Sequence, residues 1–509
     1  MLARLLPLWR RLPAFLGRVL PWLVGLGAVA YVGIYLVLAV LHLRYPFELE
    51  WMEGGAVDHV RHILSGKRLY DRPTIDFVPF IYTPLYFYVS AAASKVVGLG
   101  FFSLRLISFL SSLGCFALLA LFVHRETKNR LAAVLAVGLF AGTYRESSAF
   151  MDIARVDSLA LLFLLLGLYV LRFREGLGFR LLAVALFLLS FLTKQSMLVA
   201  AAPLAVYALF ADGWKRGLGF GVALFGTIGL SILALDRLHG GWFRYYVFFL
   251  PSQHPNVPAM WVDYWIEDLF APLAVSFGAA LYWFAASGEG ARKARLFWFF
   301  AAAGALGTSW GGRLHAGGWP NVLMPAFSVL AILFGLGVAT ALESIGQAPE
   351  ALRARLRAAA FGVAALQLAC VIYDPRRLVP SRSDEQAGHA FVKRLAALPG
   401  DVWLPAHGHL PTLAGKRPFA HEMAMQDILG IGGGPPGTAL RDELREALKT
   451  QRFGAVIPDT DFFKKEINLF YQRNEKDPPL FGGNDFFPVT GMKTRPRGVF
   501  SPRPVGQRR

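Results

Sequence analysis

The sequence has little cysteine and no nucleotide-binding loop. Its two cysteines, Cys115 and Cys370, lie within apolar runs and have no metal-ligand neighbours. A disulfide framework is therefore not expected. No Walker-type phosphate loop occurs, which argues against a nucleotide-driven pump. Internal repeats and low-complexity tracts are absent as well.

Acidic residues are also scarce, with 34 Asp and Glu against 52 Lys and Arg, so that the net charge is +18. A basic chain raises nucleic acid as a partner. Here, however, Lys and Arg occur in short clusters between apolar runs, which is the pattern that orients membrane proteins. We therefore expect no nucleic acid partner.

Hydrophobic residues make up 55% of the 509 residues, and many apolar runs approach the roughly 20 residues that cross a bilayer. The composition predicts a mainly α, polytopic membrane helix bundle with about eleven transmembrane helices. They are expected at 21–43, 104–124, 131–149, 158–171, 181–193, 196–211, 217–235, 269–287, 295–310, 320–341 and 357–373.

The basic N-terminus is expected to stay cytoplasmic, so the loop after the first span emerges outside. The apolar segment 82–97 is short for a span. If it crossed the membrane, five later basic clusters would leave the cytoplasmic side, so we interpret it as an interfacial helix. With eleven spans, the C-terminus is external.

Residue 374 marks a change to mixed polar sequence. We expect residues 1–373 to form the transmembrane domain, with an external catalytic loop at 44–103, and residues 374–509 to form a small external α/β domain. Within the latter, 402–406 and 455–458 are predicted strands and 438–451 a helix. The basic, proline-containing tail after Met492 is expected to be poorly ordered.

Acidic residues cluster in the first external loop, directly after an apolar run, where carboxylates need water, a cavity or a cation. The cluster contains Glu48, Glu50, Glu53 and Asp58. Two glycines follow Glu53 and allow close approach of a ligand to the backbone. The loop is predicted to be part of an active site.

Other polar side chains are expected at the same membrane face. Asp157 is a further catalytic candidate, and the side chains predicted to bind substrate are Tyr82, Asp152, Arg155, Lys194, Gln195, Arg313 and His315. A carboxylate could accept the proton of an acceptor hydroxyl, while Arg or Lys stabilises the charge on a leaving phosphate. Asp157 could instead cap the next helix. Arg155 could simply pair with Asp152 or Asp157, and Lys194 could extend to the interface.

Several of these segments, taken in order, resemble the GT-C integral-membrane glycosyltransferases, most closely the protein mannosyltransferase and aminoarabinose transferase type. The resemblance covers about residues 20–340. It rests on the acidic loop ending in Glu53 and Gly54, on the segments 66–70 and 82–86, on Arg105, which we interpret as structural, and on the second acidic loop and Lys194.

The resemblance implies a bacterial inner-membrane enzyme of the cell envelope that transfers a hexosyl or pentosyl group from a polyprenyl phosphate, with inversion, to an external glycan, lipid or protein hydroxyl. Glu53 is then the first candidate for the catalytic base, followed by Glu50, and Asp152 and Asp157 form a second acidic site. Unlike several relatives, the chain has Trp51 and Met52 between the two glutamates.

Three alternatives stay open. A divalent cation, Mg or Mn, could bind between the two acidic loops. His59 and His62 share a helical face and could bind zinc, while His407 and His409 are interpreted as a surface turn. A transporter or lipid flippase would place ionisable groups near the bilayer midplane, whereas here they occur at span ends.

Overall fold

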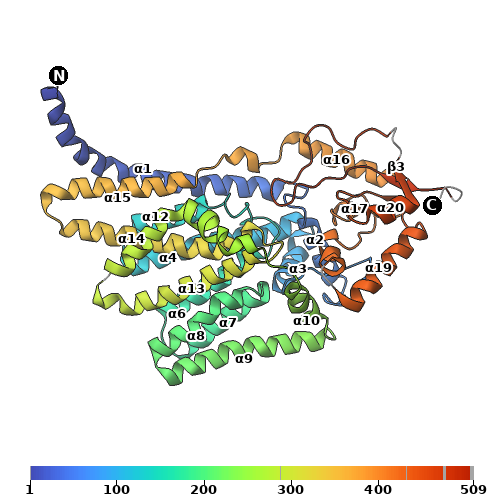
Figure 1. Cartoon of the computed structure of the whole chain (residues 1–509), viewed down its shortest axis with the longest axis horizontal. Helices are drawn as coiled ribbons and strands as arrows, with labels where there is room; N and C mark the ends of the chain where they lie inside the picture. The colour runs from blue at the N-terminus through green and yellow to red at the C-terminus, as the bar shows by residue number, and fades with distance from the viewer. Residues whose placement is uncertain (1, 287, 431–432, 474–476, 505–509) are drawn as a thin grey trace.

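The computed structural model describes residues 2–286, 288–430, 433–473 and 477–504. Long helices lie side by side and form one part of the molecule, and a smaller region that contains the C-terminus lies at one end of them (Figure 1). Helices α2 and α3 lie between the two parts. The mainly α architecture predicted from composition is confirmed.

Each of the eleven predicted apolar runs overlaps a helix of the bundle. These helices are α1 (Leu2–Arg44), α4 (Phe101–Thr127), α5 (Arg130–Gly142), α6 (Asp157–Phe173), α7 (Leu177–Thr193), α8 (Met197–Asp212), α9 (Trp214–Leu238), α12 (Ala271–Ala286), α13 (Arg292–Leu314), α14 (Met324–Gln347) and α15 (Glu350–Cys370). Residue 287, the end of one predicted run, lies outside the described residues.

Short helical turns connect some of these helices. They are α10 (Trp242–Arg244), η1 (Tyr245–Phe249), α11 (Leu250–Ser252), η2 (Pro258–Trp261), η3 (Tyr264–Phe270), η4 (Glu289–Ala291), η5 (Pro320–Leu323) and η6 (Pro375–Leu378). Two of them extend their neighbours: η3 continues into α12 and η5 continues into α14.

Five helical segments of the described chain are long and apolar enough to cross a membrane, or six if the bent pair Glu350–Cys370 and Pro375–Ala397 counts as one. The five are Leu12–Arg44, Phe101–Thr127, Trp214–Leu238, Tyr264–Ala286 and Pro320–Gln347. Several other helices are apolar but shorter than 18 residues. The total of about eleven crossings therefore stays a prediction.

Burial distinguishes the centre of the bundle from its outside. In the most apolar part of Pro320–Gln347, 94% of the segment is buried inside the structure. Its helix α14 packs against α4, α5, α12 and α13. In α9 the corresponding figure is 17%, and Leu218, Val222 and Leu230 are exposed. An extended apolar surface of this kind suits contact with lipid.

The helix predicted over 131–149 is shorter in the structure. α5 ends at Gly142, and the following turn includes positive φ values at Ser148 and Ala149. The hydroxyl of Thr143, the residue directly after α5, bonds to Phe140 O at 2.7 Å. Such side chains compete with helical hydrogen bonding, which explains the early end.

Two short helices follow α1, namely α2 (Glu53–Leu64) and α3 (Leu85–Val97). α2 ends just before Gly66, whose φ of +77° lies in the left-handed region that favours glycine. α3 falls within the predicted interfacial segment 82–97. Its 13 residues span only about 20 Å, which is less than the roughly 30 Å of a bilayer core.

The C-terminal region combines short helices with a four-stranded sheet. Its elements are α16 (Arg382–Ala397), β1 (Val402–Trp403), α17 (Leu410–Leu413), α18 (Glu422–Leu429), α19 (Gly434–Lys449), β2 (Ala455–Val456), α20 (Lys464–Phe470), β3 (Tyr471–Arg473) and β4 (Phe500–Pro502). The strand order is β1-β2-β4-β3, with β1 and β2 parallel and the other pairs antiparallel.

The predicted strands exist but are shorter, with two residues each. The tail after Met492 is not poorly ordered throughout, because its β4 pairs with both β2 and β3. Residues 505–509 lie outside the described part. The domain boundary at residue 374 remains a prediction.

The C-terminal region packs directly on the first loop. The ring centroids of Phe47 and Phe486 lie 5.5 Å apart, and those of Trp51 and His421 lie 5.2 Å apart. Both apolar clusters of the C-terminal region include buried residues of the chain between α1 and α4. This region therefore helps to hold the acidic loop in place.

Candidate active site

Glu53, the first residue of α2, forms a fully buried ion pair with Arg105 of α4. Arg105 Nε lies 2.9 Å from Glu53 Oε1, and Nη2 lies 2.6 Å from Oε2. The backbone N–H groups of Leu49 and Ala154 donate to the same carboxylate, each at 2.7 Å. These four bonds fill the roughly four acceptor sites of a carboxylate.

The remaining N–H groups of Arg105 donate to backbone carbonyls at the end of α1 and in the loop after it. The acceptors are His42 O at 2.8 Å, Tyr45 O at 2.7 Å and Phe47 O at 2.5 Å. The structural role predicted for Arg105 is confirmed. A catalytic base needs an oxygen that can reach the acceptor proton. Both oxygens of Glu53 are already fully bonded, so this geometry does not favour Glu53 as the base, although the resemblance makes it the first candidate.

Glu50 is less tightly held. Its Oε2 accepts from Met52 N at 3.2 Å and lies 3.4 Å from Arg155 Nη1. Arg155 Nη2 in turn donates to the Tyr82 hydroxyl at 2.7 Å. Burial raises the pKa of Glu50 to about 7, and the Arg155 cation opposes the rise. The structure thus brings together three predicted site residues, Glu50, Tyr82 and Arg155.

A second group lies at the start of α6. Lys194 Nζ donates to Asp157 Oδ1 at 2.6 Å, and Asn321 Nδ2 donates to the same oxygen at 2.8 Å. Asp157 Oδ2 is buried and has no hydrogen-bond partner among the described residues. Asp157 is the first residue of α6, and the N-cap of this helix is Val156, so the alternative that Asp157 caps the helix is wrong, although its carboxylate lies near the helix start.

Electrostatic coupling links the two groups. Burial raises the pKa of the Tyr82 hydroxyl; the Arg155 cation lowers it, and the carboxylates of Asp157 and Glu50 raise it further. Asp157 also contributes to the raised pKa of Arg155. Two cations, Arg155 and Lys194, and two carboxylates, Glu50 and Asp157, thus lie in one buried region. The cations suit a phosphate group, and a carboxylate suits a hydroxyl proton that is to be removed.

Asp152 belongs to a different environment. Its carboxylate accepts from the Tyr144 hydroxyl at 2.5 Å and lies 2.7 Å from His42 Nδ1, whose other ring nitrogen contacts Leu378 O at 2.6 Å. Both Asp152 and His42 are fully buried. The prediction that Asp152 binds substrate is therefore not supported by this geometry, which ties α1 to the turn before α6.

The other predicted residues lie around these groups. Gln195 Nε2 donates to Ile81 O at 2.7 Å and so supports the segment that carries Tyr82. Arg313 pairs with Asp268 at 2.6 Å and donates to Gly318 O. His315 is exposed, and no contact joins it or Arg313 to Glu50.

Metal binding has little support in the described residues, where no three His, Cys, Asp or Glu side chains are grouped to hold an ion. Four carboxylates of the two acidic loops, those of Glu53, Glu50, Asp157 and Asp152, are paired with Arg105, Arg155, Lys194 and His42 in that order. His59, one of the two possible zinc ligands on α2, uses both ring nitrogens, toward Gly55 O and Phe80 N, each at 2.6 Å. The divalent cation stays a prediction.

His407 and His409 do not form a surface turn, since both are buried. His407 Nδ1 contacts a carboxylate oxygen of Glu48, and Nε2 lies 2.8 Å from Asp459 Oδ2. Burial alone would lower the pKa of His407, but the carboxylates of Asp459 and Glu48 raise it well above its usual value. An imidazolium therefore joins the first loop to the C-terminal region, because tertiary contacts bury a segment that reads as a turn.

Comparisons with known proteins support the fold. ArnT from Cupriavidus metallidurans, solved with bound undecaprenyl phosphate, aligns with 93% of this chain and 97% of its own, at a TM-score of 0.57 and 14% identity. The apo form of ArnT aligns over the same shares at a TM-score of 0.52. The fold is the GT-C fold. The membrane architecture and fold predicted from the sequence are thereby confirmed.

Sequence comparison adds less to the GT-C assignment. No family model matches the chain. An uncharacterised protein of Aquifex aeolicus (strain VF5) is 30% identical over 210 residues, which are 39% of this chain and 46% of that protein. The match thus spans less than half of the relative.

Asn321 and Asp427 were not singled out from the sequence. Asn321 follows Trp319 and Pro320, a segment noted only for Arg313 and His315, and its amide reaches Asp157 across 164 residues. Asp427 lies 3.3 Å from His254 and adds to the raised pKa of Tyr82. No local pattern reports either contact, because both arise from packing between distant elements.

Proposed function

We propose that the protein is a membrane glycosyltransferase that moves a sugar from an undecaprenyl-phosphate-type donor to an acceptor hydroxyl at the external membrane face. The observation that carries the proposal is the buried contact of Glu50 with Arg155, which in turn bonds to the Tyr82 hydroxyl, within a GT-C fold that in ArnT binds undecaprenyl phosphate. The sugar and the acceptor are left unassigned.

Glu50 takes the role of general base. A base works best when its pKa lies near the operating pH, and burial places that of Glu50 at about 7. The carboxylate accepts the acceptor proton while the acceptor oxygen bonds to the anomeric carbon. The bond from that carbon to the donor phosphate breaks, and the phosphate leaves with the electron pair. Attack opposite the leaving group inverts the anomeric configuration.

Arg155 and Lys194 stabilise the charge that develops on the departing phosphate. Both cations are at least nine-tenths buried, where an ionic interaction is stronger than in water. Asp157 positions the Lys194 ammonium group, and the Asn321 amide holds the same oxygen of Asp157. The apolar outer surface of the bundle suits the prenyl chain, which needs no polar contact.

The test compares Glu50→Gln with Glu53→Gln in purified protein. Labelled sugars on a panel of polyprenyl phosphates are offered with a membrane extract as acceptor. We expect Glu50→Gln to lower transfer by about 10²- to 10⁴-fold, the usual contribution of a general base. Glu53→Gln should lower the yield of folded protein more than transfer per folded molecule.

The opposite pattern, with transfer lost only in folded Glu53→Gln, would return the base role to Glu53. If the wild-type protein consumes no donor, while a labelled lipid or sugar crosses reconstituted vesicles, the protein is a transporter and the proposal is wrong.

A further inference from the structure

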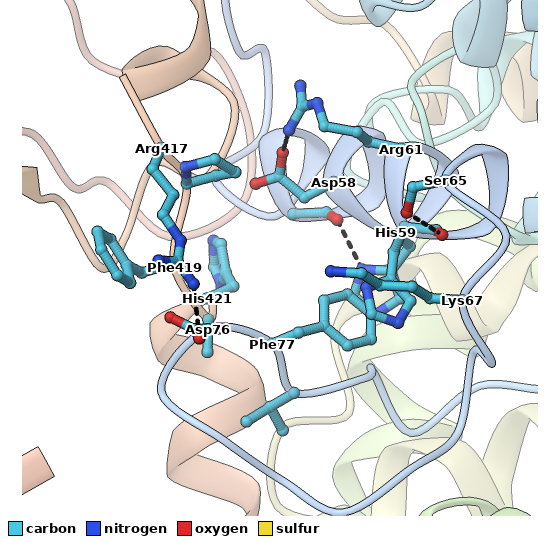
Figure 2. A pocket seen from close by; sticks show the side chains of 15 residues that line it. Asp58, His59, Arg61, Ser65, Lys67, Asp76, Phe77, Arg417, Phe419 and His421 are labelled. Carbon is cyan, nitrogen blue, oxygen red and sulfur yellow. Dashed lines mark hydrogen bonds and ion pairs between the residues drawn. The ribbon is translucent and has the colours of Figure 1, made fainter. Parts of the chain in front are cut away.

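A cavity of about 270 Å³ lies between α2 and the segment 417–421 of the C-terminal region (Figure 2). None of the base and phosphate-binding residues proposed above lines it. It is near the lower end of the roughly 300–1,000 Å³ typical of ligand pockets. A space of this size suits one monosaccharide unit rather than a lipid.

Among the described residues that line this cavity, Lys67 is the cation without an ion-pair partner. Arg61 pairs with Asp58, and Arg417 pairs with Asp76 at 2.7 Å. Lys67 is exposed, and its side chain extends into the cavity (Figure 2). Among the described residues no carboxylate lies within ion-pair distance of its ammonium group. An anionic group would complete this pairing.

The rest of the wall is neutral and partly aromatic. Burial lowers the pKa of His59 to about 3 and that of His421 to about 4, so both imidazoles are neutral. The ring of Phe77 stacks on His62 with centroids 3.8 Å apart and planes 7° apart. Flat apolar faces with a few fixed polar groups are suited to a sugar ring.

His421 connects this cavity to the proposed base. Its Nδ1 accepts from Met423 N at 3.1 Å, so the proton of the neutral ring is on Nε2, which donates to Trp51 O at 3.0 Å. Trp51 directly follows Glu50. A ligand in the cavity would thus lie against the loop that carries the base.

We propose that this cavity binds an acidic sugar unit of the acceptor, with a carboxylate or phosphate group on Lys67 and the ring against Phe77. The identification of this sugar as part of the acceptor rests on the proposed glycosyl transfer. The binding of an acidic sugar in the cavity does not depend on it. The proposal narrows the acceptor to an anionic saccharide.

Binding is measured directly, by saturation-transfer NMR or calorimetry on the full chain in detergent. The probes are glucuronate, glucose 6-phosphate, glucose and inorganic phosphate. We expect the two acidic sugars to bind at least tenfold more tightly than glucose or phosphate alone. Lys67→Met should weaken them by about tenfold or more, the value of a hydrogen bond to a charged group.

Arg68→Met is the matched control, because Arg68 is an exposed neighbouring cation that does not line the cavity. The affinity of the Arg68→Met variant for the acidic sugars should stay at the wild-type value. Unchanged melting temperatures show that both variants are folded. If both variants lose affinity for the acidic sugars to the same extent, the effect comes from the general positive charge of the surface, and the proposal is wrong.

Equal binding of glucose and glucuronate, or of phosphate and glucose 6-phosphate, would also overturn it. The first result would remove the need for an anion, and the second the need for a sugar. Glu50→Gln should retain the binding while losing transfer. Acidic sugars that bind at Lys67 in a protein without transfer would leave the cavity assignment intact and contradict only the proposed function.

Discussion

Arg105 holds both carboxylate oxygens of Glu53, at 2.9 and 2.6 Å, where neither side chain has exposed surface. The pair fixes the beginning of α2 against α4. Glu50, three residues earlier, therefore lies on a loop whose end is anchored. Anchoring of this kind lets a residue with looser bonds keep a defined position near a substrate.

The ion pair predicts a large stability cost on truncation. Replacing Glu53 with Gln leaves the buried Arg105 charge uncompensated, and loss of one partner of a buried pair costs about 3–5 kcal/mol. The free energy of unfolding of the purified protein should fall by that amount. Glu343→Gln, at an exposed position of α14, should change it by less than about 0.5 kcal/mol.

The double variant Glu53→Gln, Arg105→Met should be more stable than the sum of the two single changes predicts, because the second change removes the uncompensated charge. Additive effects would mean that the two side chains do not depend on each other.

The pH dependence of transfer should report Glu50. A base acts in its deprotonated form, so kcat/KM should be high above about pH 7 and fall as the pH drops through that value. Arg155 opposes the rise of this pKa. Arg155→Gln should therefore move the acidic limb to higher pH, in addition to lowering the rate.

Profiles of kcat/KM from pH 5.5 to 9 check this prediction. Arg353→Gln, an exposed change on α15, should leave the limb in place. If the acidic limb stays near pH 7 in Arg155→Gln, Glu50 is not the group whose titration limits kcat/KM.

Stability should depend on pH through His407. Its pKa is raised in the folded state by Asp459 and Glu48, so its contribution is full below the ordinary value of 6.5 and is lost as pH rises through the folded-state pKa. Burial raises the pKa of Glu48, whose ionisation therefore also costs stability at higher pH. The unfolding midpoint should decline between pH 6 and pH 9.

His407→Gln should flatten this decline and lower the midpoint at pH 6. His389→Gln, at an exposed position of α16, should keep the wild-type slope. A slope unchanged in His407→Gln would assign the pH dependence to other groups.

Local sequence was sufficient to predict the apolar helices of the bundle and the region in which the candidate site lies. The eleven apolar runs overlap eleven helices because an element of a membrane bundle must be continuously apolar and satisfy its own backbone. Arg155 and Asp157 were expected near the first loop because span ends at one face lie together, and contacts across about 105 residues confirm this for Arg155.

By itself, the sequence determined that this chain is a helical membrane protein with carboxylates and cations at the ends of its spans. Tertiary structure alone decided which of the two glutamates is less tightly held. Glu50 and Glu53 are three residues apart in one loop, and their difference comes from Arg155 and Arg105. Hydrogen-bond saturation depends on partners brought in by packing, and local sequence does not encode these partners.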